Sequence, residues 1–518
     1  MKSSQTNVLR LLRQIVVSPA ADPISANRPA QESRRQFIRQ LAAATAGTVL
    51  SDQLFACRSA GQPKIAIIGA GMAGLTAAYY LEKAGLRVEL FESDSRVGGR
   101  VRSAQNLLAT GIVTELGGEF IDSHHTDIMT LCRAFDLPLL DTKAPTERQL
   151  IRTRYVFGGQ HISEPDIIRA FTPFAERIRR DGQHLAGSSA QKNLAISQLD
   201  RLSIDAYLAQ LGMSGWLSTL ISTSFTSEFG LSAGEQSCLN LLAILSPDTT
   251  RGFEVYGESD ERYKVVGGNE RIITELGQRL KSPVQTGFHL ERMVQKSSGY
   301  QLSFANGRQT EVDYVVMTLP FSVLRTIQFE MPISARKRQC IQELGYGTVS
   351  KLFIGVTERV WRRDGYSGIA ISDQIQNGWD SSHMQQANTG PGGYTLLLGG
   401  EKGRRLTINQ FDSYLAGCNQ VFSGMNQATN GQKNLYNWTA NPLARGAYAC
   451  YKVGQVTTIG RAEGERAGNV LFAGEHCSRR FQGYMNGAAE TGRRAAEDIA
   501  TELGVSSFQS VRREKVSG

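Results

Sequence analysis

Cysteine, proline and long apolar runs are all sparse in this chain of 518 residues. Its 7 Cys form no CxxC pair and no regular spacing, so neither a structural zinc site nor a disulfide framework is indicated, and most should be buried small hydrophobes. No apolar run reaches the roughly 18 residues that a membrane-spanning helix needs. With 41% apolar residues and only 14 Pro, the composition excludes collagen-like and disordered classes and suffices for a large core.

The net charge of +9 is concentrated at the two ends of the chain. Residues 1–61 hold +5 and residues 505–518 hold +2, so the remaining body carries only +2. A nucleic-acid-binding protein needs a basic stripe on its folded body. We therefore expect no nucleic acid partner.

The first 61 residues have the pattern of an export leader. Arg34 and Arg35 precede Phe37 and an apolar stretch at 41–50 that is too short for a mature spanning helix. The segment resembles a twin-arginine signal, which implies a periplasmic or membrane-tethered protein, or a cytoplasmic one if the leader is not used. Residues 54–57 resemble a loose lipoprotein box, which makes Cys57 a candidate lipid anchor. The alternative is a plain basic N-terminus or a short amphipathic helix.

The segment 64–92 has the order of a dinucleotide-binding unit. Its apolar runs predict a buried strand at 65–68 and a second strand at 87–91. Between them a glycine-rich turn leads into a helix predicted at 73–83. The unpaired N–H groups at the start of such a helix can bind phosphate.

Three glycines and one acid give this unit its chemistry. Gly69 permits the tight turn, Gly71 lets the backbone approach a pyrophosphate, and Gly74 allows close helix–strand contact. Glu92 follows the last glycine by 18 residues, where a carboxylate can accept from ribose hydroxyls. An acid at this position favours FAD or NAD over NADP.

Two further glycine-rich turns separate FAD from NAD. They read RVGGR at 96–100 and ELGGEFI at 115–121. This ordering resembles the flavin-containing amine oxidase family, which includes monoamine, polyamine and L-amino-acid oxidases. By that resemblance Arg100 supports the pyrophosphate, and Gly117 and Gly118 let the backbone lie against the flavin. Without the resemblance they are two glycine-rich turns and nothing more.

The far end of the chain matches the same family. A buried strand is predicted at 470–473 and a helix at 485–499, with small residues on the helix face that must approach a neighbour. The resemblance implies that Glu475 holds the ribityl chain and that the N–H of Met485 faces the flavin, where a helix N-terminus stabilises negative charge. It also implies that the backbone of Val294 touches the adenine. The remaining expected cofactor contacts are Met72, Ala73, Ser93, Gly99 and Trp438.

The predicted fold class is α/β, with a discontinuous Rossmann-like FAD-binding domain and an α+β substrate domain that contains a mixed sheet. The predicted FAD-binding stretches are 62–138, 260–334 and 440–503. The predicted substrate-domain stretches are 139–259 and 335–439, and residues 504–518 form a tail. The oligomeric state is left open, a homodimer included.

Lys351, Tyr448 and Tyr484 are the candidate catalytic residues. Lys351 lies in an apolar, strand-like segment whose alternation allows an inward or an outward side chain. In the family a lysine in this setting holds a water at the flavin N5. The two tyrosines match positions where monoamine oxidases place two rings that orient an amine through their π-faces. Ordinary core packing is the alternative for both rings.

Two interpretations of Asp122 are equally supported by the sequence. It matches a position where plant polyamine oxidases carry an acid that faces a cationic substrate, and it could equally cap a helix at 124–135. His124 and His125 are expected to be surface or capping groups, and no spacing suggests a metal. Many L-amino-acid oxidases have an arginine after the second glycine-rich turn that binds the substrate carboxylate. This chain lacks it, so either the substrate is a plain amine or another residue, such as Arg445, binds the carboxylate.

The sequence thus predicts an FAD-dependent oxidase of primary or secondary amines. A hydride would pass from the amine α-carbon to flavin N5, the imine would hydrolyse, and O₂ would reoxidise the flavin to give H₂O₂. Ala447 stands where some monoamine oxidases have the cysteine that links the flavin, so the FAD is expected to be non-covalent. Two alternatives remain: an oxidase or dehydrogenase of basic L-amino acids such as L-arginine or L-lysine, with a quinone as a further acceptor, and a non-catalytic FAD-binding scaffold.

Overall fold

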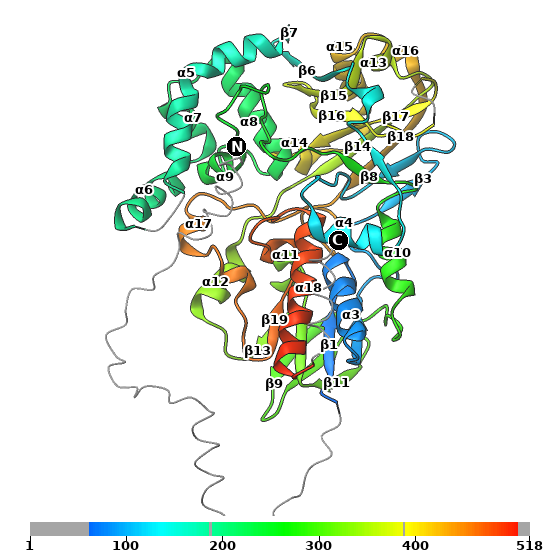
Figure 1. The fold of residues 1–518 in the computed structure, drawn as a ribbon, viewed down its shortest axis with the longest axis vertical. Coiled ribbons are helices and arrows are strands. Elements are labelled where there is room, and N and C mark those ends of the chain that lie inside the picture. The colour runs from blue at the N-terminus through cyan, green and yellow to red at the C-terminus, as the bar shows by residue number, and fades with distance from the viewer. Residues whose placement is uncertain (1–61, 186–188, 387–388, 506–518) are drawn as a thin grey trace, which may run out of the picture.

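The computed structural model describes residues 62–185, 189–386 and 389–505. The expected export signal, the candidate anchor Cys57 and most of the expected tail lie outside these residues. Within the described part no helix is long and apolar enough to cross a membrane. The chain forms two halves stacked along the long axis, with both the first and the last described segments in the lower half (Figure 1).

A four-stranded parallel sheet forms the centre of the lower half. Its strand order is β19-β12-β1-β2, and every neighbouring pair is parallel. The strands are β1 (Ile65–Ile68), β2 (Val88–Phe91), β12 (Tyr314–Met317) and β19 (Val470–Phe472). The strands predicted at 65–68, 87–91 and 470–473 are therefore confirmed, apart from one residue at an end of each of the last two. The sheet unites chain segments that lie some 400 positions apart.

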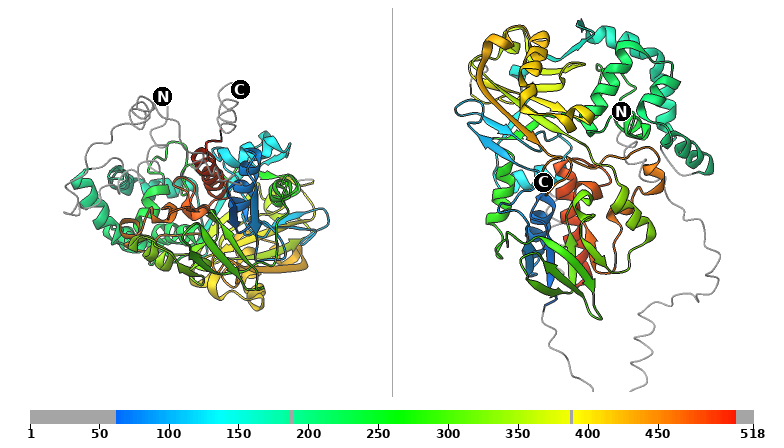
Figure 2. Two further views of the ribbon diagram at one scale, coloured as in Figure 1. Left: turned by 90° about the horizontal axis from the view of Figure 1, so that it is seen from below. Right: turned by 180° about the vertical axis from the view of Figure 1, so that it is seen from behind.

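The first and last helices of the described chain pack against each other beside this sheet. They are α3 (Met72–Lys83) and α18 (Met485–Glu502), and they lie side by side in all views (Figures 1 and 2). A Cβ on Gly492 would lie 2.2 Å from the carbonyl oxygen of Ala73, and one on Gly74 would lie 1.8 Å from that of Gly69. Only glycine therefore fits at these two positions, where helix backbone meets neighbouring backbone, and the small residues of 485–499 indicated such a close approach for α18.

A second, four-stranded sheet and several helices complete the lower half. The strands are β9 (Leu290–Gln295), β10 (Tyr300–Phe304), β11 (Gln309–Val312) and β13 (Gln328–Glu330), and the helices are α4 (Thr126–Ala134), α10 (Glu270–Gln278), α11 (Phe321–Leu324), α12 (Ala335–Glu343) and α17 (Gln455–Thr458). Helix α12 differs from the predicted domain plan. Its Cys340 and Ile341 pack into the core around Val315 and Met317. Helix α12 therefore belongs to the lower half, and the predicted substrate-domain stretch 335–439 begins too early.

The upper half contains a seven-stranded mixed sheet covered by helices. The sheet order is β18-β14-β17-β16-β15-β6-β7, and only β15 and β6 pair in parallel. The strands are β6 (Ile151–Phe157), β7 (Gln160–Ile162), β14 (Ser350–Val356), β15 (Tyr366–Ser372), β16 (Gln376–Asp380), β17 (Gly392–Leu398) and β18 (Thr429–Asn437). Two separate stretches of the chain therefore share one sheet, which confirms the predicted mixed sheet.

The helices of the upper half fall into two groups. The first group, at the upper left of Figure 1, comprises α5 (Glu164–Gln183), α6 (Ala190–Asp200), α7 (Ile204–Gln210), α8 (Gly215–Phe229) and α9 (Cys238–Ile244). The second group comprises α13 (Val360–Arg363), α14 (Gly400–Arg405), α15 (Phe411–Val421) and α16 (Met425–Ala428). Two short antiparallel pairs, β3 (Ser103–Gln105) with β4 (Val113–Glu115) and β5 (Leu139–Asp141) with β8 (Tyr263–Val265), complete the described strands.

The six cysteines of the described chain are all buried and free. This confirms the expectation of small apolar packing residues for these six. Burial raises the pKa of all six to values where a thiolate is not populated at neutral pH, for instance to about 11 for Cys132.

Candidate active site

A single long cavity runs from the parallel sheet of the lower half to the mixed sheet of the upper half. Its volume is about 320 Å³, within the range of ligand sites. At one end it is lined by Gly69, Gly71 and Glu92. At the other end it is lined by Lys351 and by Tyr448 and Tyr484, the tyrosine pair. The predicted site residues that line it are Gly69, Gly71, Met72, Ala73, Glu92, Ser93, Gly99, Arg100, Gly117, Gly118, Asp122, Lys351, Trp438, Tyr448, Glu475, Tyr484 and Met485.

The lower end of the cavity fits a dinucleotide. Gly71 lies at the start of α3, and a Cβ placed there would meet nothing closer than 4.0 Å, so this backbone is open to a ligand. The carboxylate of Glu92 accepts from the backbone N–H of Ala70 at 2.7 Å and of Asp94 at 2.8 Å. Each oxygen of this carboxylate keeps a lone pair for a hydroxyl group.

The middle of the cavity is built where glycines let chain segments approach one another. A Cβ on Gly117 would lie 1.9 Å from the carbonyl oxygen of Arg100, and one on Gly118 would lie 2.9 Å from the Met485 sulfur. The indole N–H of Trp438 donates to the carbonyl oxygen of Leu116 at 2.9 Å. The Gly118–Met485 contact places the start of α18 against the second glycine-rich turn.

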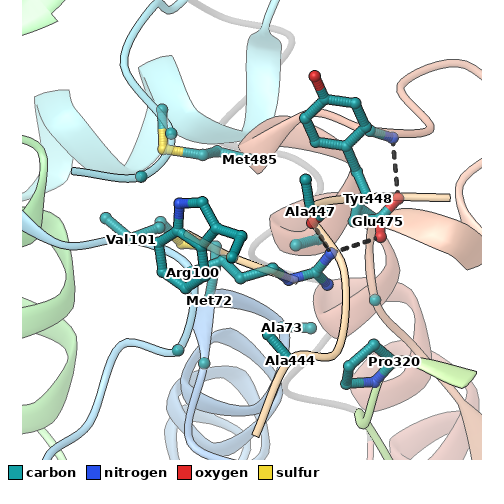
Figure 3. Close-up of a pocket in the computed structure, with 18 of the residues that line it drawn as sticks. Met72, Ala73, Arg100, Val101, Pro320, Ala444, Ala447, Tyr448, Glu475 and Met485 are labelled. Carbon is teal, nitrogen blue, oxygen red and sulfur yellow. Dashed lines mark hydrogen bonds and ion pairs between the residues drawn. The ribbon is translucent and has the colours of Figure 1, made fainter. Parts of the chain in front are cut away.

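Arg100 and Glu475 connect the two ends of the chain across this region. The guanidinium of Arg100 donates to Glu475 Oε1 at 2.8 Å and to the carbonyl oxygen of Ala447 at 2.5 Å (Figure 3). The same carboxylate accepts from the backbone N–H of Gly483 at 2.9 Å and from that of Ala449. Glu475 therefore positions Arg100 and the tyrosine-bearing loops together, and its expected contact with a ribityl chain stays a prediction.

Arg100→Ala is expected to weaken FAD binding about 10- to 100-fold, because a charge-assisted hydrogen bond is worth about 1.5–3 kcal/mol. Titration of the apoprotein with FAD, followed by the quenching of flavin fluorescence, measures the change. Arg102→Ala is the matched control, since Arg102 contacts Tyr436 and does not line the cavity. Equal FAD affinity of the Arg100 variant and the unaltered protein would contradict the assigned contact.

Lys351 is buried and points into the cavity from β14. The residue is 5% exposed, and its Nζ donates to the carbonyl oxygens of Glu115 and Gly117 at 3.0 and 2.8 Å and to Glu119 Oε2 at 3.0 Å. The alternation within the strand left its direction open, and the structure shows it inward. All three N–H bonds of an ammonium group have acceptors here, so the side chain is a fixed positive charge at the cavity wall.

Glu119 holds a second buried lysine. Lys264 Nζ lies 3.3 Å from Glu119 Oε1 and donates to the carbonyl oxygen of Ser381, but Lys264 does not line the cavity. Burial opposes ionisation of Glu119, yet the ammonium groups of Lys351 and Lys264 keep its pKa below the usual value. The carboxylate is therefore ionised between its two partners.

Tyr448 and Tyr484 both reach the cavity and both contact one residue, Glu228 of helix α8. The Tyr448 hydroxyl donates to the carbonyl oxygen of Glu228 at 2.6 Å, and the Tyr484 hydroxyl donates to Glu228 Oε1 at 3.4 Å. Burial, reinforced by Glu228, raises the pKa of both phenols well above the usual value. Both rings are therefore neutral and fixed at their hydroxyl ends.

Asp122 is 2% exposed and belongs to the cavity wall. Its Oδ1 accepts from the backbone N–H of Glu261 at 2.8 Å and from the Ser259 hydroxyl at 3.1 Å. The helix-cap alternative for Asp122 is wrong. Helix α4 begins at Thr126, four residues after Asp122, and no side chain forms a capping hydrogen bond at its start.

His125 takes the N-cap position of α4, one of its two expected places, but its side chain is buried and makes no capping hydrogen bond. Its Nδ1 accepts from the backbone N–H of Asp122 at 3.0 Å, and its Nε2 lies 3.3 Å from Asp122 Oδ2. Burial lowers its pKa to about 3, so the ring is neutral at ordinary pH. Its ring centroid lies 5.1 Å from that of Tyr484, and the two rings support each other beside the cavity.

Three predicted site residues do not line the cavity. Val294 lies within β9, whereas the cavity is lined by the residues at and before the start of that strand, 288–290. Arg445 is exposed, with its Nε donating to the carbonyl oxygen of Pro442, so the hypothesis of a carboxylate-binding Arg445 is not supported. Gly74 serves helix packing, as its predicted role required.

Several residues that line the upper end of the cavity had no predicted role. They are Glu119, Glu228, Ser259, Glu261, Asn377 and Trp379. One signal could have identified Glu228, which is the only charged residue between positions 206 and 234. Glu261 carries no comparable signal, because it stands among other acids in a loop.

The described chain matches the family model for flavin containing amine oxidoreductase over residues 72–500. The chain belongs to this family. FAD is the cofactor of the family, and the glycine-lined lower end of the cavity fits it. The enzyme class and the cofactor expected from the sequence are thus confirmed.

Curated relatives and solved structures agree with this assignment. The chain is 26% identical over 468 residues to the flavin-containing amine oxidase B of Sus scrofa, covering 85% of this chain and 86% of that protein. It is 23% identical to the L-amino-acid oxidase of Echis ocellatus, covering 86% and 91%. Its fold is similar to that of the cyclohexylamine oxidase from Brevibacterium oxydans IH-35A, with a TM-score of 0.73, 20% identity, and coverage of 86% and 100%.

Proposed function

We propose that the protein oxidises an amine in the upper end of this cavity and reduces O₂ to H₂O₂. The observation that carries the proposal is the cavity itself, which joins a dinucleotide-shaped lower end to an upper end with a fixed lysine and two neutral tyrosines. FAD, when bound, supplies the acceptor for a hydride equivalent from the amine α-carbon. The resulting imine hydrolyses to a carbonyl compound and ammonia or a smaller amine.

The side chains of the upper end orient the substrate and exclude water. The faces of Tyr448 and Tyr484 attract and align an amine, and their hydroxyl bonds to Glu228 keep the rings in place. Lys351 places a positive charge at the wall, where negative charge develops as oxygen is reduced. The proposed role of Lys351 is therefore in reoxidation of the cofactor.

Oxidation of a basic L-amino acid is the second candidate, favoured by the acidic residue Asp122 and by the relationship to L-amino-acid oxidases. An α-amino acid brings a carboxylate that needs a cationic partner. Arg96 and Arg100 are the arginines of the described cavity lining, and Arg100 is already bound to Glu475 at the cofactor end. A plain amine therefore fits the upper end better.

Non-covalent attachment of FAD is part of the proposal. The described cavity lining includes no cysteine, and Cys450 lies buried behind it with an Asn240 amide against its sulfur. Release of the flavin into the supernatant on acid precipitation would agree with this. Export through the twin-arginine route, with a quinone as alternative acceptor for a tethered enzyme, also stays a proposal.

Anaerobic reduction of the bound flavin by a panel of amines tests the proposed function. The panel contains tyramine, spermidine, L-lysine and L-arginine, and loss of the flavin absorbance is recorded for each. We expect bleaching by at least one amine without a carboxylate. Bleaching by the amino acids alone would favour the second candidate, and no bleaching by any compound would favour a non-catalytic FAD scaffold.

A further inference from the structure

Helix α8 ends beside the tyrosine pair with a carboxyl group that no cation balances. Glu228 lies in the last turn of this helix, which stops at Phe229 because Gly230 takes the left-handed conformation, with a φ of +74°. A helix C-terminus carries partial negative charge, so a carboxylate at this place is disfavoured. Within the described chain no lysine, arginine or histidine forms an ion pair with Glu228.

Glu228 holds both rings of the tyrosine pair, each by a different atom. Its main-chain carbonyl oxygen, one of the last four of the helix and so without a partner inside it, accepts from the Tyr448 hydroxyl at 2.6 Å. Its Oε1 accepts from the Tyr484 hydroxyl at 3.4 Å. Among the described residues no other hydrogen bond reaches the carboxyl group, and the residue lines the cavity. A ligand beside the rings can therefore bond to Oε2.

Other acids that line this end of the cavity have different surroundings. Glu119 is paired with two lysines. Asp122 accepts from the backbone N–H of Glu261 and from the Ser259 hydroxyl. The hydroxyl groups of the tyrosine pair bond to Glu228 and not to Glu261. Glu228 is thus the acid of the described lining that contacts the tyrosine pair directly.

An amine must lose a proton before it can be oxidised as proposed. At neutral pH an alkylamine is an ammonium ion, whose nitrogen has no electron pair with which to form the C=N bond of an imine. The most effective acceptor for such a proton is a side chain within hydrogen-bond reach whose pKa lies near the working pH. Burial, followed by the charges of Glu261 and Asp122, raises the pKa of Glu228 to about 8, although the bond from Tyr484 lowers it.

We propose that Glu228 is the proton acceptor of the reaction: its carboxylate takes the ammonium proton of the substrate, so that a neutral amine lies against the faces of Tyr448 and Tyr484. The inference rests on the proposed function and adds a catalytic residue to it. The N–H bond breaks with its electron pair left on nitrogen, and an O–H bond forms at Glu228. This step oxidises nothing and needs no further reactant. The proton passes from Glu228 to solvent once the product has left.

The pH dependence of flavin reduction follows from this role. Below about pH 8 the empty site holds a proton on Glu228, which an incoming ammonium ion must displace. The second-order rate constant for reduction by pentylamine should therefore rise with pH and level off near pH 8. In Glu228→Gln the rise should continue towards the pKa of the amine itself, because only the neutral amine then reacts. The groups that face this carboxyl are Asp122, Tyr256, Glu261, Tyr448 and Tyr484.

The test compares pentylamine with 2,2-difluoropentylamine in anaerobic flavin reduction by the holoenzyme at pH 8. The fluorine atoms lower the pKa of the amine, so that this compound is already neutral in solution. We expect Glu228→Gln to slow reduction by pentylamine about 100-fold and reduction by the difluoro compound less than about tenfold. Glu258→Gln is the matched control, because Glu258 is exposed and does not line the cavity. An equal loss for both amines, or no loss for either, would overturn the proposal.

A binding measurement separates this inference from the proposed function. The probe is tert-pentylamine, which has no α-hydrogen and cannot be oxidised, and calorimetry at pH 7 in buffers of different ionisation enthalpy counts the protons released when it binds. We expect about one proton from the unaltered protein and from Glu258→Gln, and none from Glu228→Gln, because only an ionisable Glu228 has a proton to give up. FAD content and the thermal midpoint check that each variant is folded.

The outcomes of the two experiments are distinct. Equal proton release by the unaltered protein and Glu228→Gln, or no binding of tert-pentylamine to either, would exclude the assigned role of Glu228. If no amine bleaches the flavin but proton release still differs as expected, Glu228 exchanges its proton with a bound amine while the proposed oxidase activity fails. If amines bleach the flavin and the rates of both proteins respond equally to pH, the oxidase stands without this proton acceptor.

Discussion

Lys351→Met is expected to slow reoxidation of the reduced enzyme by O₂ about 100- to 1,000-fold, the effect of removing one preorganised electrostatic group from an active site. The ammonium of Lys351 has three acceptors and lines the cavity, so it cannot move away as negative charge develops on oxygen. Stopped-flow mixing of dithionite-reduced holoenzyme with oxygenated buffer measures the rate constant. Anaerobic reduction by the amine should change much less.

Lys264→Met is the matched control for this experiment. Lys264 shares the Glu119 carboxylate with Lys351 but lies outside the cavity lining. Its removal disturbs the same ion-pair cluster without removing the charge at the wall. If both variants slow reoxidation equally, the effect originates in the cluster, and the proposed role of Lys351 is wrong.

Glu119→Gln is expected to destabilise the fold by about 3–5 kcal/mol, because it leaves two buried ammonium groups without their carboxylate. Lys351 Nζ and Lys264 Nζ lie 3.0 and 3.3 Å from its two oxygens, and all three side chains are buried. For a chain of this size the thermal midpoint should fall by about 3–5 °C, measured by differential scanning calorimetry on the holoenzyme.

Acid should reduce the difference between the Glu119 variant and the unaltered protein. The pKa of Glu119 is held below its usual value in the folded state, so its stabilising contribution is present above the unfolded pKa and is lost as the pH falls through the folded pKa. The double variant with Lys264→Met should recover part of the stability, because one unpaired charge is then removed. A single variant as stable as the unaltered protein would contradict the assigned ion pairs.

The cofactor end of the site could be predicted from local sequence because each of its parts follows from a short-range requirement. Gly69, Gly71 and Gly74 stand in fixed spacing between a strand and a helix, and the structure shows the reason at Gly74, where any Cβ would collide with Gly69. Glu92 directly follows the strand β2, whose last residue is Phe91. The predicted adenine contact, Val294, lies four residues beyond Leu290, the residue of β9 that lines the cavity. No glycine or charge pattern in the sequence marks where this strand begins.

The substrate end could be predicted only in part. Lys351, Tyr448 and Tyr484 were identified through motifs and do line the cavity. Arg445, named as a possible partner for a substrate carboxylate, stands near one of those tyrosines in sequence but is exposed. Distance along the chain says little about proximity in a site that several elements build.

The sequence by itself determined the nucleotide-binding unit, the family and the flavin, because these depend on glycines and apolar strands whose spacing is local. Only the tertiary structure decided what surrounds the substrate. It brought Glu228 from helix α8 and Glu261 from a strained loop to the side of Asp122, and it joined Lys264 and Lys351 at Glu119. The charge balance of a cavity is a property of long-range packing, which no single segment of the chain encodes.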